Sequence, residues 1–214
     1  MKRKLFLLVF SFLVVDPSVA NAQAEVLIEP EKADYAVYSA LIDNYFSGSR
    51  ARHSKNLLII ENRTTDEGQY HLTCDTGMAG QCKKPFADRL REVLGDVDQS
   101  AVDNFVLRNR AGRSLTASFA IEEKYVLVSK EKLKEAFEPC SSEAWDCWKN
   151  FFKRYPKASR ITRLSAVGFN SERTQALVYL ATSCGGLCGG GMIAFLVKEQ
   201  ERWKVVEKKQ LWIS

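Results

Sequence analysis

Residues 161–207, ITRLSAVGFNSERTQALVYLATSCGGLCGGGMIAFLVKEQERWKVVE, decide the fold. Apolar and polar residues alternate in this stretch with a period of two, which is typical of β-strands. The pattern predicts four strands, over 161–169, 174–182, 192–198 and 202–207, joined at 170–173, 184–191 and 199–201. Connections this short join antiparallel neighbours, because a parallel crossover needs about a dozen residues or more. The C-terminal part of the chain is therefore expected to form an antiparallel β-meander.

The chain upstream of this meander has the apolar spacing of helices, with residues recurring every three or four positions. We expect helices over 31–46, 85–94, 99–109, 130–137 and 142–155, a short strand over 56–62, and an extended segment over 117–129. Helices that precede an antiparallel sheet predict an α+β fold, with the N-terminal helices packed on one face of a curved sheet.

This layout loosely resembles the NTF2-like and cystatin-like cone, in which N-terminal helices close against a C-terminal sheet that often ends in a tryptophan-containing strand. Trp203 and Trp212 stand where such residues would be expected. Two extra strands and several extra helices depart from that pattern. The resemblance implies a fold and no function.

The first 22 residues have the pattern of a cleavable secretory signal. Lys2, Arg3 and Lys4 precede an apolar run over 5–15, and the small-residue pattern Ala20-Asn21-Ala22 predicts cleavage before Gln23. The run is too short for a transmembrane helix, which needs about 20 apolar residues. We therefore expect a signal peptide over 1–22 and a single exported α+β domain over 23–214, periplasmic or secreted, without stable membrane insertion after cleavage.

The charge balance excludes some partners. The whole chain carries 31 basic and 26 acidic side chains and a net formal charge of +5. Without the signal residues the net charge is about +3, with both signs mixed along the chain. This is too mild to predict nucleic-acid binding.

The cysteines predict disulfides, because an exported chain with an even number of cysteines usually pairs them. Six cysteines allow 15 pairings, and the sequence alone does not select one. They fall into three close couples, and local pairing of these couples is the expectation: Cys74 with Cys82, Cys140 with Cys147, and Cys184 with Cys188.

The couple Cys184-x3-Cys188 in its glycine frame allows a second interpretation, as a redox pair or as a nest of backbone amides that binds an anion. Redox pairs usually have the spacing Cys-x2-Cys at a helix N-terminus, whereas strands are expected on both sides here. A zinc or iron–sulfur site would need further ligands, and the chain has only two histidines, His53 and His71. We favour a structural bridge and expect no metal or cofactor.

Three other patterns have both a functional and a structural interpretation. His71, Cys74 and Asp75 contain the residue types of a nucleophilic triad, although paired cysteines would leave no free thiol. The carboxylate pairs Asp96/Asp98 and Glu122/Glu123 are interpreted as solvated surface. An aromatic stripe is interpreted as a core face rather than a sugar- or lipid-binding groove; it comprises Trp145, Trp148, Phe152 and Tyr155.

A C-terminal signature resembles that of a group of exported bacterial proteins without an assigned activity. It covers about the last 55 residues and consists of 165–170 (SAVGFN), 174–179 (TQALVY), 184–191 (CGGLCGGG), 203–205 (WKV) and 211–214 (LWIS). The resemblance implies export and architecture, and it assigns no chemistry.

Together these patterns predict an exported, disulfide-stabilised module that binds an envelope or extracellular protein or ligand and is not an enzyme. The alternative is a small extracytoplasmic enzyme, hydrolase-like, with a cavity between helices and sheet. A pocket with inward-facing titratable residues would favour the enzyme.

Overall fold

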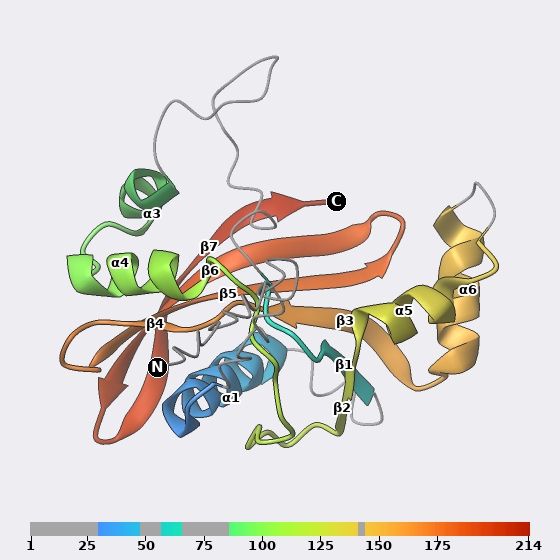
Figure 1. Cartoon of the computed structure of the whole chain (residues 1–214), viewed down its shortest axis with the longest axis horizontal. Coiled ribbons are helices and arrows are strands. Elements are labelled where there is room, and N and C mark those ends of the chain that lie inside the picture. Colours follow the sequence, from blue (N-terminus) through green and yellow to red (C-terminus); the bar gives the residue numbers. More distant parts are fainter. Residues whose placement is uncertain (1–29, 48–56, 66–85, 141–143) are drawn as a thin grey trace, which may run out of the picture.

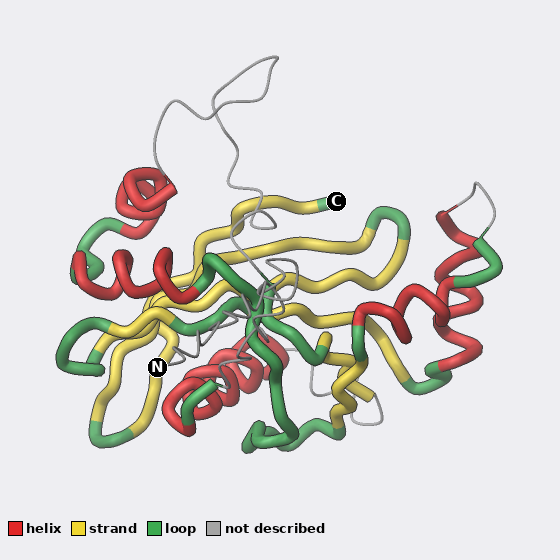
Figure 2. The backbone as a smooth tube through the Cα atoms, in the orientation of Figure 1, coloured by secondary structure: helices red, strands yellow, loops and turns green. Residues whose placement is uncertain are grey.

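The computed structural model describes residues 30–47, 57–65, 86–140 and 144–214. Its helices are α1 (Lys32–Ser47), α3 (Phe86–Leu94), α4 (Gln99–Arg108), α5 (Lys130–Phe137) and α6 (Ala144–Arg154). Its strands are β1 (Leu57–Glu61), β2 (Tyr125–Val128), β3 (Ala158–Leu164), β4 (Gly168–Phe169), β5 (Gln175–Gly185), β6 (Cys188–Glu199) and β7 (Arg202–Ile213). The α+β class is confirmed (Figures 1 and 2).

The strands of the described part form one seven-stranded mixed sheet in the order β2-β1-β3-β5-β6-β7, with β4 beside β5. The antiparallel pairing of β3, β5, β6 and β7 agrees with the predicted meander. The first predicted strand, however, is divided into β3 and β4. The parallel part of the sheet was not predicted: β1 lies between β2 and β3 and is parallel to both. The long connections between these strands, which carry helices, permit this arrangement.

Helices cover both faces of the sheet, so the expectation that they pack on one face is wrong. Side chains of β5 alternate between the faces, as strand geometry requires. Val178 and Leu180 pack with α1, whereas Leu177 and Tyr179 pack with α3 and α4 on the other face. Figure 1 shows α1 on the opposite side of β5–β7 from α4. The apolar runs of the central strands match this burial on both faces.

The aromatic stripe forms a core, as predicted. Trp148 and Phe151 of α6 are buried, and they pack with Phe137 of α5 and with Ile59 and Ile161 of the sheet. Phe152 and Tyr155 are half-buried at the margin of this cluster. The side chain of Trp145 is outside the described part of the chain.

The glycine run after Cys188 lies within β6 rather than in a long loop. Strands β5 and β6 pair as far as Gly185 and Cys188, which leaves a two-residue tip. A Cβ at Gly191 would collide with the indole of Trp212 and the hydroxyl of Tyr179. The Trp212 Nε1 group donates a hydrogen bond to the Tyr179 hydroxyl at 2.8 Å. Glycine is needed here because these two side chains meet over the backbone of β6.

Candidate functional site

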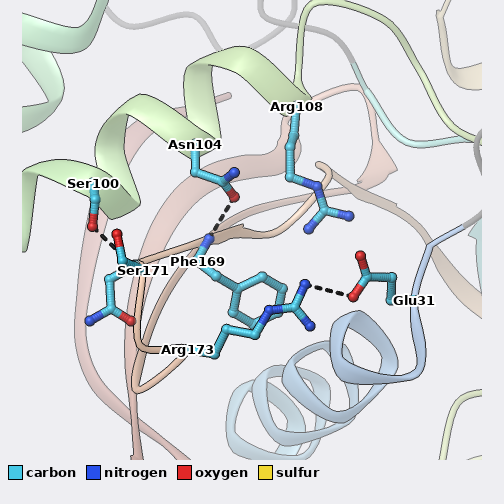
Figure 3. A pocket seen from close by; sticks show the side chains of 8 residues that line it. Glu31, Ser100, Asn104, Arg108, Phe169, Ser171 and Arg173 are labelled. Carbon is cyan, nitrogen blue, oxygen red and sulfur yellow. Dashed lines mark hydrogen bonds and ion pairs between the residues drawn. The ribbon is translucent and has the colours of Figure 1, made fainter.

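A cleft of about 310 Å³ opens between the start of α1, one face of α4 and the turn that joins β4 to β5. Its walls are mostly polar. Figure 3 shows the side chains that line it, which are Glu31, Ser100, Asn104, Arg108, Phe169, Asn170, Ser171 and Arg173.

Helix α4 brings three of these side chains to the cleft because Ser100, Asn104 and Arg108 are four residues apart and share one face of the helix. The adjoining face carries Ala101, Val102 and Phe105, which are buried. The amphipathic pattern of α4 therefore fixes which side chains can reach the cleft.

Polar side chains of α4 and of its C-cap residue Asn109 form hydrogen bonds with the backbone of the segment around β4. Asn109 accepts a hydrogen bond from the Ala166 amide at 2.8 Å and donates one to the Ala166 carbonyl at 3.0 Å. Asn104 Oδ1 accepts a hydrogen bond from the Phe169 amide at 2.9 Å. Gly168 permits the close approach, because a Cβ there would collide with the backbone of Phe105.

The first turn of α4 is capped by Asp98, the second member of one predicted carboxylate pair. Its Oδ1 accepts hydrogen bonds from the Ser100 amide at 2.8 Å and the Ser100 hydroxyl at 2.7 Å. These bonds lower the pKa of Asp98. The Ser100 hydroxyl in turn accepts a hydrogen bond from the Ser171 amide at 3.1 Å. Asp98 is thus an N-cap whose partner also fixes the β4–β5 turn.

The first arginine of the cleft is anchored inside the protein. Arg108 donates from Nη1 to Asp34 Oδ1 at 2.9 Å and from Nη2 to Asp34 Oδ2 at 3.1 Å. Its Nη1 also donates to the Val167 carbonyl at 2.6 Å. Side-chain exposure is 11% for Arg108 and 0% for Asp34. Asp34 Oδ2 also accepts the Glu31 amide at 2.7 Å, so this ion pair fixes the start of α1 against α4.

The second arginine lies at the mouth of the cleft. Arg173 Nη2 donates to Glu31 Oε2 at 2.6 Å, and the two side chains are 52% and 55% exposed. The Arg173 guanidinium lies 5.3 Å from the Phe169 ring centroid, and that of Arg108 lies 5.8 Å from the same ring. Both guanidinium groups therefore lie within cation–π distance of the Phe169 ring, an arrangement that cation–π attraction favours.

The backbone holds Arg173 in an unusual conformation, with φ at +55°. Few residues other than glycine adopt this region, and it costs an L-residue about 1 kcal/mol or more. Asn170 fixes the turn: its Oδ1 accepts the amides of Thr174 at 2.8 Å and Gln175 at 2.9 Å, and its carbonyl accepts the Arg173 amide at 3.0 Å. These hydrogen bonds compensate for the backbone strain at Arg173. The resulting turn directs the Arg173 side chain over Phe169.

Three arginines act on the carboxylate of Glu31. The hydrogen bond from Arg173 is the main influence that lowers the pKa of Glu31, and the charges of Arg173, Arg108 and Arg113 add to it. The pKa of Arg113 is lowered first by burial and then by the charge of Arg108.

Chemically, the cleft offers several hydrogen-bond donors. Asn104 Oδ1 accepts the Phe169 amide, which leaves the Nδ2 group of Asn104 as a donor. Arg108 and Arg173 also have N–H groups beyond those bonded to Asp34, Val167 and Glu31. Glu31 is the single carboxylate among the lining residues, and none of them is a cysteine or histidine. Its lowered pKa makes Glu31 a poor proton donor and a poor base near neutral pH.

The structure bears out part of the predicted disulfide scheme. Cys140 pairs with Cys147 at a Cα–Cα distance of 4.8 Å, and Cys184 pairs with Cys188 at 5.1 Å. Cys140 precedes α6, as the helical rise requires. The third couple, Cys74 and Cys82, lies outside the described residues, as do His53, His71 and Asp75 of the triad pattern. The two disulfides of the described part do not line the cleft.

Sequence reasoning missed every residue of the cleft. Glu122 and Glu123 precede β2 and do not line it. The four-residue spacing of Ser100, Asn104 and Arg108 was visible, but such a face is normally solvated surface. The signature stretch SAVGFN contained two further lining residues, Phe169 and Asn170, and Gly168 and Phe169 meet α4 there.

No protein-family model, curated protein or solved structure matches the chain. Across the described ranges, no group of three or more His, Cys, Asp or Glu residues is arranged to hold a metal ion. Within the same ranges, no helix has the length and apolar character needed to cross a membrane. The described part of the chain has an α+β fold with two disulfides.

Proposed function

We propose that the protein, as residues 23–214, is an exported binding module whose cleft between α1, α4 and the β4–β5 turn takes an anionic ligand. The observation that carries the proposal is the pair of guanidinium groups, from Arg108 and Arg173, above Phe169. Arginine presents a planar set of donors that suits oxyanions. The amide of Asn104 adds a further donor on the α4 side.

The positions of the charged groups support binding rather than catalysis. Arg108 is bound to Asp34, and Arg173 is bound to Glu31, so each cation of the cleft already has a carboxylate partner. A general acid or base needs a pKa near the working pH and a reactive partner within hydrogen-bond reach. Glu31 has a lowered pKa and bonds to an arginine instead.

Export is supported by the signal-like pattern over 1–22, which lies outside the described residues, together with the two disulfides. Disulfides persist in the oxidising compartments that exported proteins reach. Intact-mass analysis of the protein recovered from the envelope of its own host tests this part. A mass that begins at Gln23 is expected, and a mass that retains 1–22 would overturn it.

Binding is tested by recording amide NMR spectra while citrate is added, with glucose as the uncharged control. We expect citrate to shift the amides of Phe169, Ser171 and Arg173, whereas the amides of the β5–β6 tip, such as Leu187, stay unchanged. Addition of sodium chloride at matched ionic strength separates binding from screening. If glucose and citrate give the same shifts, or if neither gives any, the cleft is not an anion site.

A further inference from the structure

The two arginines of the cleft differ in how firmly they hold their carboxylates. Asp34 is fully buried and makes two bonds to Arg108, and removal of one partner would leave an uncompensated charge inside the protein. Glu31 and Arg173 are both about half exposed and share one hydrogen bond. Exposed ion pairs contribute little to stability, because water replaces either partner at small cost. Only the Arg173 pair is therefore exchangeable.

We infer that the ligand carries a carboxylate group that displaces Glu31 from Arg173. In the free protein, the carboxylate of Glu31 acts as an internal competitor for this position. This inference rests on the proposed binding function. In the free protein the Glu31 carboxylate occupies the bonding position on Arg173 that the acidic group of the ligand takes in the complex.

The geometry around Arg173 favours a planar acid. Glu31 Oε2 lies 2.6 Å from Nη2 of Arg173, and the guanidinium lies over Phe169. A carboxylate can match the fork of a guanidinium in one plane with two bonds, whereas Glu31 bonds to Arg173 through one oxygen. Displacement exchanges one carboxylate for another, so the charge balance on Arg173 is preserved while Glu31 becomes solvated.

The backbone supports a ligand-holding role for Arg173. A glycine would adopt its φ of +55° without strain, yet an arginine stands there and Asn170 fixes the turn around it. Strained residues that their surroundings hold in place tend to occur at functional sites. The Glu31–Arg173 pair at the surface adds too little stability to account for this strain by itself.

Propionate, which has the carboxylate end of a glutamate side chain, is the probe that tests the inference. Its dissociation constant is measured by amide NMR titration of the full mature protein and of three variants, Glu31→Gln, Arg173→Gln and Glu172→Gln. Glu172 is the matched control, since it is an exposed carboxylate adjacent to Arg173 in the same turn. Thermal melts of each variant establish that it is folded.

We expect Glu31→Gln to bind propionate about two- to five-fold more tightly than the unaltered protein, because the internal competitor is removed. Glu172→Gln should bind as the unaltered protein does, and Arg173→Gln should lose binding at the cleft. In the unaltered protein, saturating propionate should move the carboxyl 13C resonance of Glu31 towards that of a solvated glutamate.

Three results would contradict the inference. They differ in whether they also contradict the proposed anion-binding function. If propionate shifts the cleft amides but Glu31→Gln binds no more tightly, displacement is wrong and the cleft remains an anion site. If inorganic phosphate binds Glu31→Gln more tightly than propionate does, the carboxylate class is wrong. If neither anion shifts the cleft amides in any variant, the binding function itself fails.

Discussion

Arg108 and Asp34 form a two-bond ion pair between helices that lie far apart in the sequence, with Nη–Oδ distances of 2.9 and 3.1 Å. The same carboxylate accepts the Glu31 amide, and the same guanidinium donates to the Val167 carbonyl. One buried contact therefore fixes the start of α1, the end of α4 and the segment before β4. Through Arg108 it also supplies part of the lining of the cleft.

Removal of one partner of this pair should destabilise the protein strongly. We expect Arg108→Leu to lower the free energy of unfolding by about 3 kcal/mol or more, because Asp34 is left buried and unpaired. Urea denaturation measures the change. The double variant Arg108→Leu/Asp34→Leu should regain a large part of the loss. A double variant that is as unstable as the sum of both single variants would show that the two side chains are not coupled.

Arg173→Gly separates the strain of the turn from the proposed binding role. Glycine adopts a positive φ without penalty, so we expect the free energy of unfolding to stay the same or rise by up to about 1 kcal/mol. The loss of an exposed ion pair offsets little of this gain. Anion binding at the cleft should disappear. A stable variant that still shifts the Phe169 amide with citrate would show that Arg173 does not hold the ligand.

Glu31 should titrate below its ordinary pKa of 4.5, chiefly because Arg173 donates a hydrogen bond to it. The ion pair therefore stabilises the folded state above about pH 4.5, and this contribution is lost as the pH falls through the lowered pKa. Carboxyl 13C NMR measures the titration. Arg173→Gln should move the pKa of Glu31 upwards and leave Asp98, whose pKa is lowered by Ser100, as it was.

The disulfide between Cys184 and Cys188 should stabilise the hairpin without taking part in redox chemistry. We expect Cys184→Ser/Cys188→Ser to lower the free energy of unfolding by about 2 kcal/mol, the entropic estimate for so short a closed loop. Thermal melts measure this effect. The single variant Cys184→Ser should be worse, because it leaves a thiol that is free to mispair. An unchanged melting temperature together with a loss of thiol–disulfide exchange would favour a redox centre.

The elements that were predicted well are those whose signal is local. The segment 130–137 was predicted with the exact bounds of α5, and the alternation over 174–182 placed β5 within a few residues. The strands around the glycine run were predicted too short. Glycine normally indicates a loop, whereas Gly191 is required because Trp212 and Tyr179 pack over it.

The parallel pairing of β1 and the cleft were not predictable, because both depend on residues that are distant in the sequence. Ile59 pairs with Ile161, and no local sequence pattern in either segment indicates that these two strands are neighbours. In the same way, Ser100, Asn104 and Arg108 have the spacing of an ordinary exposed helix face. This helix face becomes one side of a cleft only because α4 contacts Gly168 and Phe169, whose segment forms the other side.

The position of β1 between β2 and β3 also bears on the order in which the chain can fold during its synthesis. A polypeptide made from its N-terminus releases α1 and β1 first, yet β1 pairs with β2 and β3, and α1 packs on β5 and β7. Non-local pairings form slowly, since the chain must close long loops before any contact stabilises it. β1 therefore lacks its neighbours until residue 164 has been made, and α1 lacks its sheet until the last strand, β7, has been added.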